Sequence, residues 1–201
     1  MTKRIIIGGI AGGLVMFIWG AVSHMVLQLG DAGLSQFKEQ EEPVLTALRA
    51  HVKEPGLYFF PGLSSSHPSD AEQKAWQEKY RRGPAGLVLL VPGGAEAMTG
   101  PQFLVQIGAD VAISLLAAVL LAGTGCWLNR FGSRVGFVAL IGLMPFLAVN
   151  LPYWNWYRFP TVFTLAQLAD RFLGFVLIGV TLALIIKKPA SSTQQPPASP
   201  T

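Results

Sequence analysis

Four long apolar runs dominate the sequence, at residues 5–29, 103–128, 135–151 and 163–186. A helix needs about 20 mostly apolar residues to cross the hydrocarbon layer of a bilayer, and each run is close to that length. Only 13% of the residues are charged, and these collect between the first and second runs. An ordinary soluble domain carries roughly 25% charged residues. The sequence therefore predicts a mainly α-helical integral membrane protein built on a four-helix bundle.

The apolar runs divide the chain into four parts. We expect transmembrane helix 1 within residues 1–29, an extracytoplasmic insertion at 30–102, transmembrane helices 2–4 within 103–188, and a disordered cytoplasmic tail at 189–201. The tail is rich in Pro, Ser and Gln, a composition that does not form an apolar core. A cleaved signal peptide is the alternative for the first run, because basic residues precede it. The length of that run favours a retained helix.

The insertion carries the signals of two helices and two strands. Pro43 suits the first turn of a helix, and Ser69 with Glu72 forms a capping box that opens a second helix. Apolar runs at 56–62 and 86–93, each closed by Pro-Gly, are typical of strands. We expect a small α/β insertion. At about 70 residues it is near the lower limit for an independent core, so it should rest on the membrane helices or on a partner.

Basic residues beside the apolar runs predict the orientation of the chain. In a four-span chain all of them fall on one side, which the positive-inside rule makes cytoplasmic. Both termini are then cytoplasmic, the insertion faces outward, and the protein is a multi-pass protein of the inner (plasma) membrane. In a bacterium the insertion would lie in the periplasm. The residues concerned are Lys3, Arg4, Arg130, Arg134, Lys187 and Lys188.

Polar residues within the runs form a candidate cluster. Counting about 20 residues from the cytoplasmic end of each run brings four of them to the outer membrane boundary. With Arg171, the cluster consists of His24, Asp110, Asn150, Asp170 and Arg171. Ionisable residues inside spans are costly and often functional. The alternative is that these side chains sit in the wet headgroup layer and only anchor helices.

Small residues recur along the first run at helical spacing. Two overlapping GxxxG pairs are formed by Gly8, Gly9, Gly12 and Gly13. Such pairs let membrane helices approach closely. The contact could lie within the bundle or join two copies in a homo-oligomer.

Residues 152–160 form the densest aromatic cluster, which we interpret as a loop. Aromatic rings gather at membrane interfaces because they are amphipathic, and this explains most of the segment. The alternative is a platform for a ligand or partner, made by Trp154, Asn155, Trp156, Tyr157 and Arg158.

Several function classes find no support in the sequence. Cys126 is the single cysteine, so no intrachain disulfide is possible, and no metal-ligand spacing or dinucleotide or phosphate-loop motif occurs. The net charge of +4 comes from short clusters beside the apolar runs and not from a basic patch that would bind nucleic acid. We expect no cofactor, no metal and no catalytic constellation.

Three short segments carry a resemblance to known sequences: 55–62, 82–87, and the Trp-Asn-Trp-Tyr-Arg-Phe-Pro stretch at 154–160. With these, the chain resembles a family of small bacterial multi-span membrane proteins of unassigned function. The resemblance covers under a quarter of the chain. It implies a membrane architecture and supplies no catalytic residues.

The leading hypothesis for function is a non-enzymatic binding or accessory protein with an outward-facing interaction surface. Its partners would be the lipid bilayer and a protein or envelope component. The alternative is a subunit of a small transporter or channel, because polar residues line the expected inner faces of the spans.

Overall fold

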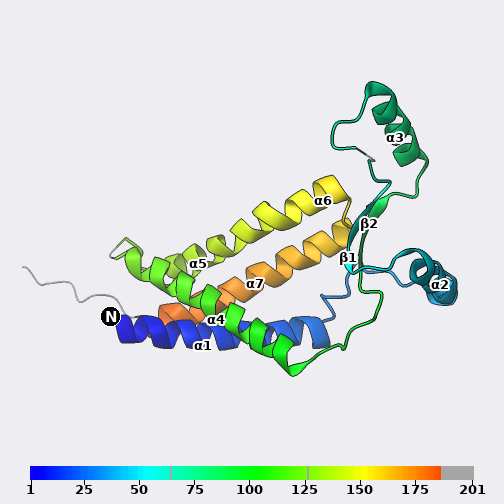
Figure 1. Ribbon diagram of the computed structural model, residues 1–201. Coiled ribbons are helices and arrows are strands. Elements are labelled where there is room, and N and C mark those ends of the chain that lie inside the picture. Colours follow the sequence, from blue (N-terminus) through cyan, green and yellow to red (C-terminus); the bar gives the residue numbers. More distant parts are fainter. Residues whose placement is uncertain (64, 126, 187–201) are drawn as a thin grey trace, which may run out of the picture.

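The computed structural model describes residues 1–63, 65–125 and 127–186. Cys126 and the predicted disordered tail at 189–201 lie outside the described residues. The described chain is mainly helical, with four long apolar helical segments and a small α/β insertion between the first two (Figure 1). The predicted fold class is confirmed.

Four helical segments of 24–27 residues are long and apolar enough to cross a membrane. At about 1.5 Å per residue they measure about 36–40 Å, which exceeds the ~30 Å hydrocarbon layer. Two of them contain a π-helical turn, η1 or η3. The segments are α1 (Thr2–Ala21) with η1 (Val22–Val26); α4 (Gly100–Gly123); α5 (Phe131–Pro145) with η3 (Phe146–Asn150) and α6 (Leu151–Tyr157); and α7 (Thr161–Ile185).

The third segment corrects the interpretation of residues 152–160 as a loop. Residues 151–157 are helical, and only Arg158 to Pro160 reverse the chain into α7. Arg158 adopts the left-handed conformation (φ 58°) that commonly ends a helix. Pro152 suggested a loop, but a proline is tolerated in the first turn of a helix. Here it follows the π turn η3 directly.

The insertion has the predicted order of helix, strand, helix and strand. Its strands pair antiparallel, with Gly56 opposite Leu90 and Phe60 opposite Gly86. Both strands keep an outer edge without a further strand among the described residues. The elements are η2 (Lys38–Gln40), α2 (Glu41–His51), β1 (Gly56–Phe60), α3 (Asp70–Arg82) and β2 (Gly86–Leu90).

The predicted capping box opens α3. The Glu72 backbone N–H donates to Ser69 Oγ at 3.3 Å, and the Ser69 N–H donates to Glu72 Oε2 at 2.8 Å. The Ser69 N–H, and after it the Ser69 hydroxyl, which also donates to Glu72 Oε2 at 2.8 Å, hold the pKa of Glu72 below its ordinary value. Trp76 then joins α3 to the end of β1, because its Nε1 donates to the Pro61 carbonyl at 2.7 Å.

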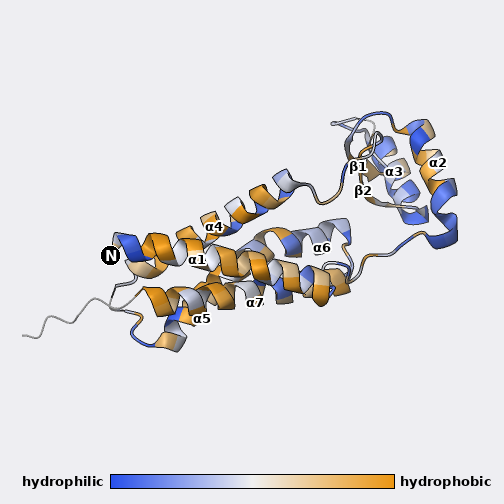
Figure 2. Cartoon of the chain, turned by 90° about the horizontal axis from the view of Figure 1, so that it is seen from below, coloured by the Kyte–Doolittle hydropathy of each residue, from blue (hydrophilic) through white to orange (hydrophobic). Residues whose placement is uncertain are grey.

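The four membrane segments form an open arrangement and not a closed square. Helix α1 packs along α4 and α7, and α5 packs along α7, while few contacts join α4 to α5. Figure 1 shows that α4 and α5 approach at the end that holds the N-terminus and diverge toward the insertion. We call these the terminal end and the insertion end. The bundle is apolar and the insertion more hydrophilic (Figure 2).

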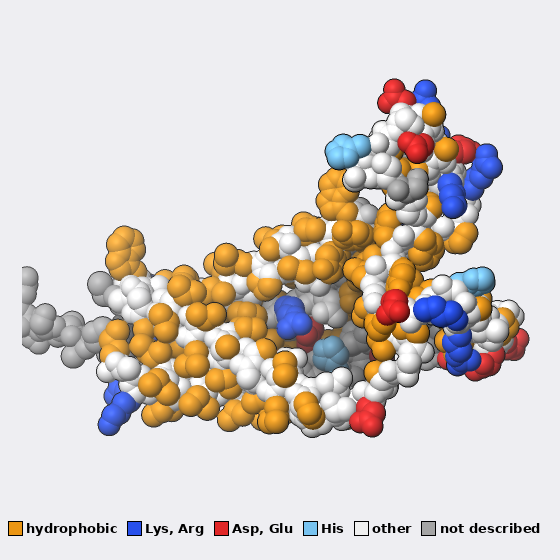
Figure 3. All heavy atoms as spheres, viewed as in Figure 1, with side chains coloured by type: hydrophobic (Ala, Val, Ile, Leu, Met, Phe, Trp, Pro, Cys, Tyr) orange, Lys and Arg blue, Asp and Glu red, His pale blue; other side chains and the backbone are white. Residues whose placement is uncertain are grey.

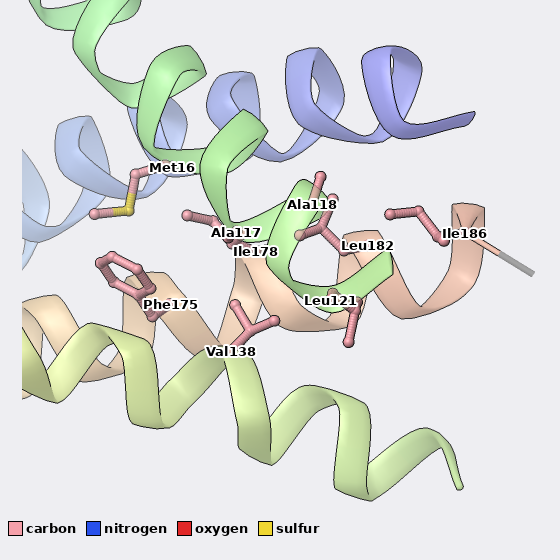
Figure 4. Packing of buried hydrophobic residues seen from close by; sticks show 9 residues of the cluster. All are labelled: Met16, Ala117, Ala118, Leu121, Val138, Phe175, Ile178, Leu182 and Ile186. Atoms are coloured by element: carbon pink, nitrogen blue, oxygen red, sulfur yellow. The ribbon is translucent and has the colours of Figure 1, made fainter. Parts of the chain in front are cut away.

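The apolar core lies toward the terminal end of the bundle, where the helices converge (Figure 4). Lipid chains are as apolar as these side chains, so close fit and not the hydrophobic effect holds membrane helices together. Several core residues have no exposed surface. The core consists of Met16, Ala117, Ala118, Leu121, Val138, Phe175, Ile178, Leu182 and Ile186.

The glycine face of α1 makes the closest helix contacts. A Cβ at Gly9 would meet the backbone of Leu115 on α4, and a Cβ at Gly13 would meet that of Val111. Gly8 and Gly12 face α7 and Ser114 in the same way. All four glycines are buried within the chain. Their contact is therefore within the bundle, which leaves them no face for the predicted contact with a second copy.

Candidate functional site

A cleft of about 450 Å³ opens between α1, α4 and α7, on the insertion side of the apolar core. Figure 3 shows basic, acidic and histidine side chains gathered in one hollow of an otherwise apolar surface. The walls combine apolar and polar groups. The polar residues of the cleft are His24, Gln102, Gln106, Asp110, Asp170 and Arg171.

Asp110 reaches the cleft from α4. Asp110, Ser114, Ala117 and Leu121 are all buried, as their spacing of three to four residues on one helix face predicts. Only 2% of Asp110 is exposed. Gln106, one turn earlier on the same face, donates through Nε2 to Asp110 Oδ1 at 3.0 Å.

Asp170 reaches the cleft from α7 and is 5% exposed. Its Oδ2 lies 3.9 Å from His24 Nε2. Its Oδ1 is buried and accepts no hydrogen bond from any residue that the structure describes. The backbone carbonyl of Asp170 accepts from Trp19 Nε1 at 3.0 Å, which ties α1 to α7 beside the carboxylate.

His24 lies in the π turn η1, where the Leu27 N–H donates to the Val22 carbonyl at 2.9 Å. Single π turns occur frequently at functional sites. The chain then folds back over the imidazole, because a Cβ at Gly30 would lie 3.0 Å from His24 Cε1. The wider turn and the glycine together hold the ring at the side of Asp170.

Arg171 lines the same cleft as the two carboxylates. Among the described residues it forms no ion pair within 4.0 Å, although Asp110 and Asp170 face the same space. The guanidinium therefore adds a positive charge to the cleft without forming an ion pair across it with the described residues.

Four of the five predicted cluster residues meet in the cleft, and Asn150 does not. Asn150 ends the π turn η3 in the third segment, away from the residues that line the cleft. Asp110 lies ten residues into α4, and Asp170 nine residues into α7. At about 1.5 Å per residue both are about 14–15 Å from the helix start.

The sequence interpretation missed the neighbours that shape the cleft. Gln106 lies four residues before Asp110, and that spacing already places both on one helix face. Trp19 carried no such signal, since its partner is a backbone carbonyl 151 residues away. The rings of Phe17 and Phe103 meet edge to face at 6.4 Å between centroids, a contact that depends on how α1 and α4 cross.

The predicted aromatic platform lies on α6 and is partly used for packing. Trp154 Nε1 donates to Thr161 Oγ1 at 3.1 Å, and Tyr157 packs edge to face on Phe59 of β1, at 6.4 Å. Trp156, Asn155 and Arg158 are exposed. A continuous column of aromatic rings, with centroids 5.3–6.4 Å apart, runs through Trp76, Tyr80, Phe59, Tyr157, Tyr153, Phe159 and Phe163.

The chemistry within reach of the cleft is acid–base and charge pairing. Within residues 1–63, 65–125 and 127–186, no three His, Cys, Asp or Glu side chains group to hold a metal ion. The polar lining holds carboxylates, an imidazole, a guanidinium and amides, but no serine or threonine hydroxyl. The arrangement suits holding a charged group and does not resemble a nucleophile with its base.

Comparison with known proteins leaves the chain without an assigned family. The architecture of several membrane helices agrees with the resemblance to small bacterial membrane proteins, and no particular family is identified. No protein family, curated protein or solved structure matches the chain.

Proposed function

We propose that this is a non-enzymatic binding protein of the plasma membrane, which holds a ligand in the cleft between α1, α4 and α7. The observation that carries the proposal is that Asp110 and Asp170, both almost fully buried, line a cavity within membrane-spanning helices. Ionisable residues at such places are costly and commonly mark binding sites. The volume of about 450 Å³ lies in the range of small-molecule sites.

The apolar core on the terminal side of the cleft favours binding over conduction. Toward the terminal end the bundle is filled by apolar side chains such as Val138, Ile178 and Leu182, which are 0% exposed. Beyond Ser114 on α4, a transported ion or polar solute would have to cross a core of apolar side chains. The alternative of a transporter or channel subunit rests on the buried carboxylates. It predicts flux in proteoliposomes that Asp170→Asn abolishes, whereas the binding proposal predicts no flux.

The insertion adds an outward-facing surface in this proposal. Basic residues beside the helices support cytoplasmic termini, and the insertion lies at the opposite end of the bundle from the N-terminus (Figure 1). Its two-stranded sheet exposes Leu57 and Leu89, at 64% and 72%. In an accessory role, the protein would present both the cleft and this surface to the same partner complex.

A cleft-filling variant tests the proposed function. Gly20 lines the cleft, and a Cβ there would meet nothing within 4 Å, so the side chain of Gly20→Leu enters the cleft without a clash at its first atom. Native mass spectrometry of protein extracted with its lipids should show a bound small molecule in wild type and none in Gly20→Leu. Gly108→Leu is the control, because Gly108 is equally uncrowded and lies outside the cleft lining.

Two results would contradict the proposal. One is wild-type protein that carries no bound molecule under conditions that preserve the fold. The other is Gly20→Leu protein that retains the same molecule in the same amount as Gly108→Leu.

A further inference from the structure

One oxygen of the buried Asp170 carboxylate has no hydrogen-bond donor among the described residues, and this bears on the kind of ligand that the cleft could hold. The residue is 5% exposed, and its Oδ1 has no hydrogen-bond donor among the residues that the structure describes. The nearest cation, His24 when protonated, approaches the other oxygen, Oδ2, at 3.9 Å. A buried carboxylate oxygen without a donor is strongly unfavourable. A positively charged ligand beside this carboxylate would lower that cost.

The charges of the cleft leave room for one cation. The lining holds two carboxylates, Asp110 and Asp170, and one guanidinium, Arg171. Two carboxylates against one guanidinium make the lining acidic on balance. A head group that brings an ammonium improves this balance, whereas an anion without one is repelled.

The rest of the lining suits an apolar chain. Phe17, Trp19 and Phe103 contribute aromatic rings, which attract ammonium groups and also pack against alkyl chains. Met25 and Met98 line the same cleft and are 67% and 64% exposed, on a surface that faces lipid in a membrane. A bare metal cation would leave most of the 450 Å³ empty and would lack the shell of oxygen ligands that hard cations need.

We infer that the ligand is an amphiphile with a primary ammonium head group and an apolar chain. The ammonium lies beside the Asp170 carboxylate, and the chain lies along Phe17 and Phe103 toward the lipid. This inference rests on the proposed function and adds the chemical class of the ligand. The ammonium could belong to a membrane lipid or to a free amphiphilic amine, since both present the same group.

The first experiment compares probes on wild-type protein in discs of phosphatidylcholine. Dodecylamine and dodecanol share a chain and differ in charge. Binding is measured as the rise of the unfolding midpoint Tm with probe concentration, because a ligand that binds only the folded state stabilises it. We expect dodecylamine to raise Tm at concentrations about tenfold or more below those that dodecanol requires.

Variants then locate the binding. Asp170→Asn keeps the size of the side chain and the Trp19 bond, which goes to the backbone carbonyl, and should abolish the preference for the amine. Gly20→Leu should abolish the response to both probes. Gly108→Leu should respond as wild type does, because Gly108 is not part of the cleft lining.

The outcomes separate this inference from the function on which it rests. Equal responses to amine and alcohol, both lost in Gly20→Leu, would overturn the ammonium assignment and keep the binding function. A preference for the amine that persists in Asp170→Asn would also overturn the assignment. No response to either probe in wild type would contradict both. Finally, phosphatidylethanolamine in the disc should compete with dodecylamine if a lipid is the source, and should not if a free amine is.

Discussion

Replacing Gly13 with alanine tests the closest helix contact of the bundle. A Cβ at Gly13 would lie 2.7 Å from the backbone nitrogen of Val111, whereas ordinary contact begins near 3.4 Å. Backbone atoms cannot turn aside, and the Val111 Cα is nearer still, so α1 and α4 must separate by about 1 Å. A gap of that order forfeits a quarter to a half of the dispersion attraction between facing atoms.

The expected cost follows from that separation. We expect Gly13→Ala to lower the free energy of unfolding by about 1–3 kcal/mol, the range typical of overpacked cores. The control is Gly108→Ala on α4, where a Cβ would meet nothing within 4 Å. Its change should stay below about 1 kcal/mol, since only helix propensity is altered.

The assay is reversible unfolding in mixed lipid and detergent micelles, titrated with sodium dodecyl sulfate and followed by circular dichroism. Both variants and the wild type are compared at one lipid composition. If Gly13→Ala is as stable as Gly108→Ala, the glycine face of α1 does not pack on α4 as described.

Two further predictions concern orientation and α3. In a Cys126→Ser background, an impermeant thiol reagent should label Ser65→Cys in intact spheroplasts and Ser133→Cys only after lysis; labelling of Ser133→Cys from outside would refute cytoplasmic termini. Ser69→Ala should weaken α3 by about 1 kcal/mol, seen as lower amide protection in hydrogen exchange. Because the folded-state pKa of Glu72 is lowered, its contribution is present above the pKa of the unfolded chain and is lost as pH falls through the folded-state pKa. Protection of α3 that is unchanged by Ser69→Ala, or independent of acidic pH, would contradict this.

Local patterns predicted the parts of the fold that depend on neighbours in sequence. The capping box of Ser69 and Glu72 and the apolar strands closed by Pro-Gly appear in the structure with nearly the predicted bounds. The third membrane segment was predicted too short, because Pro152 suggested a loop where the helix in fact continues to Tyr157. A proline signal is ambiguous at that point, since it suits both a loop and the first turn of a helix.

The candidate site could be predicted only where an uninterrupted α-helix keeps residues three or four apart on one face. Asp110 and Ser114 share a face over an uninterrupted α-helix, and both are buried. Asn150 was assigned to the cluster by its distance from the cytoplasmic end of its run, but it lies in the π turn η3, where the α-helical register is interrupted. The cleft itself depends on the angle between α1 and α4, which no local pattern encodes.

The position of the cleft between α1, α4 and α7 has a consequence for how its occupancy should be measured. A cavity that opens between the sides of helices exchanges its contents with the surrounding bilayer. Occupancy then follows the mole fraction of ligand among the lipids and not its concentration in water. Adding lipid without ligand at a constant amount of protein would then lower the occupancy of the cavity. A compound that partitions strongly into the bilayer would show a low apparent Kd when its concentration is counted in water, even though it binds the protein only moderately.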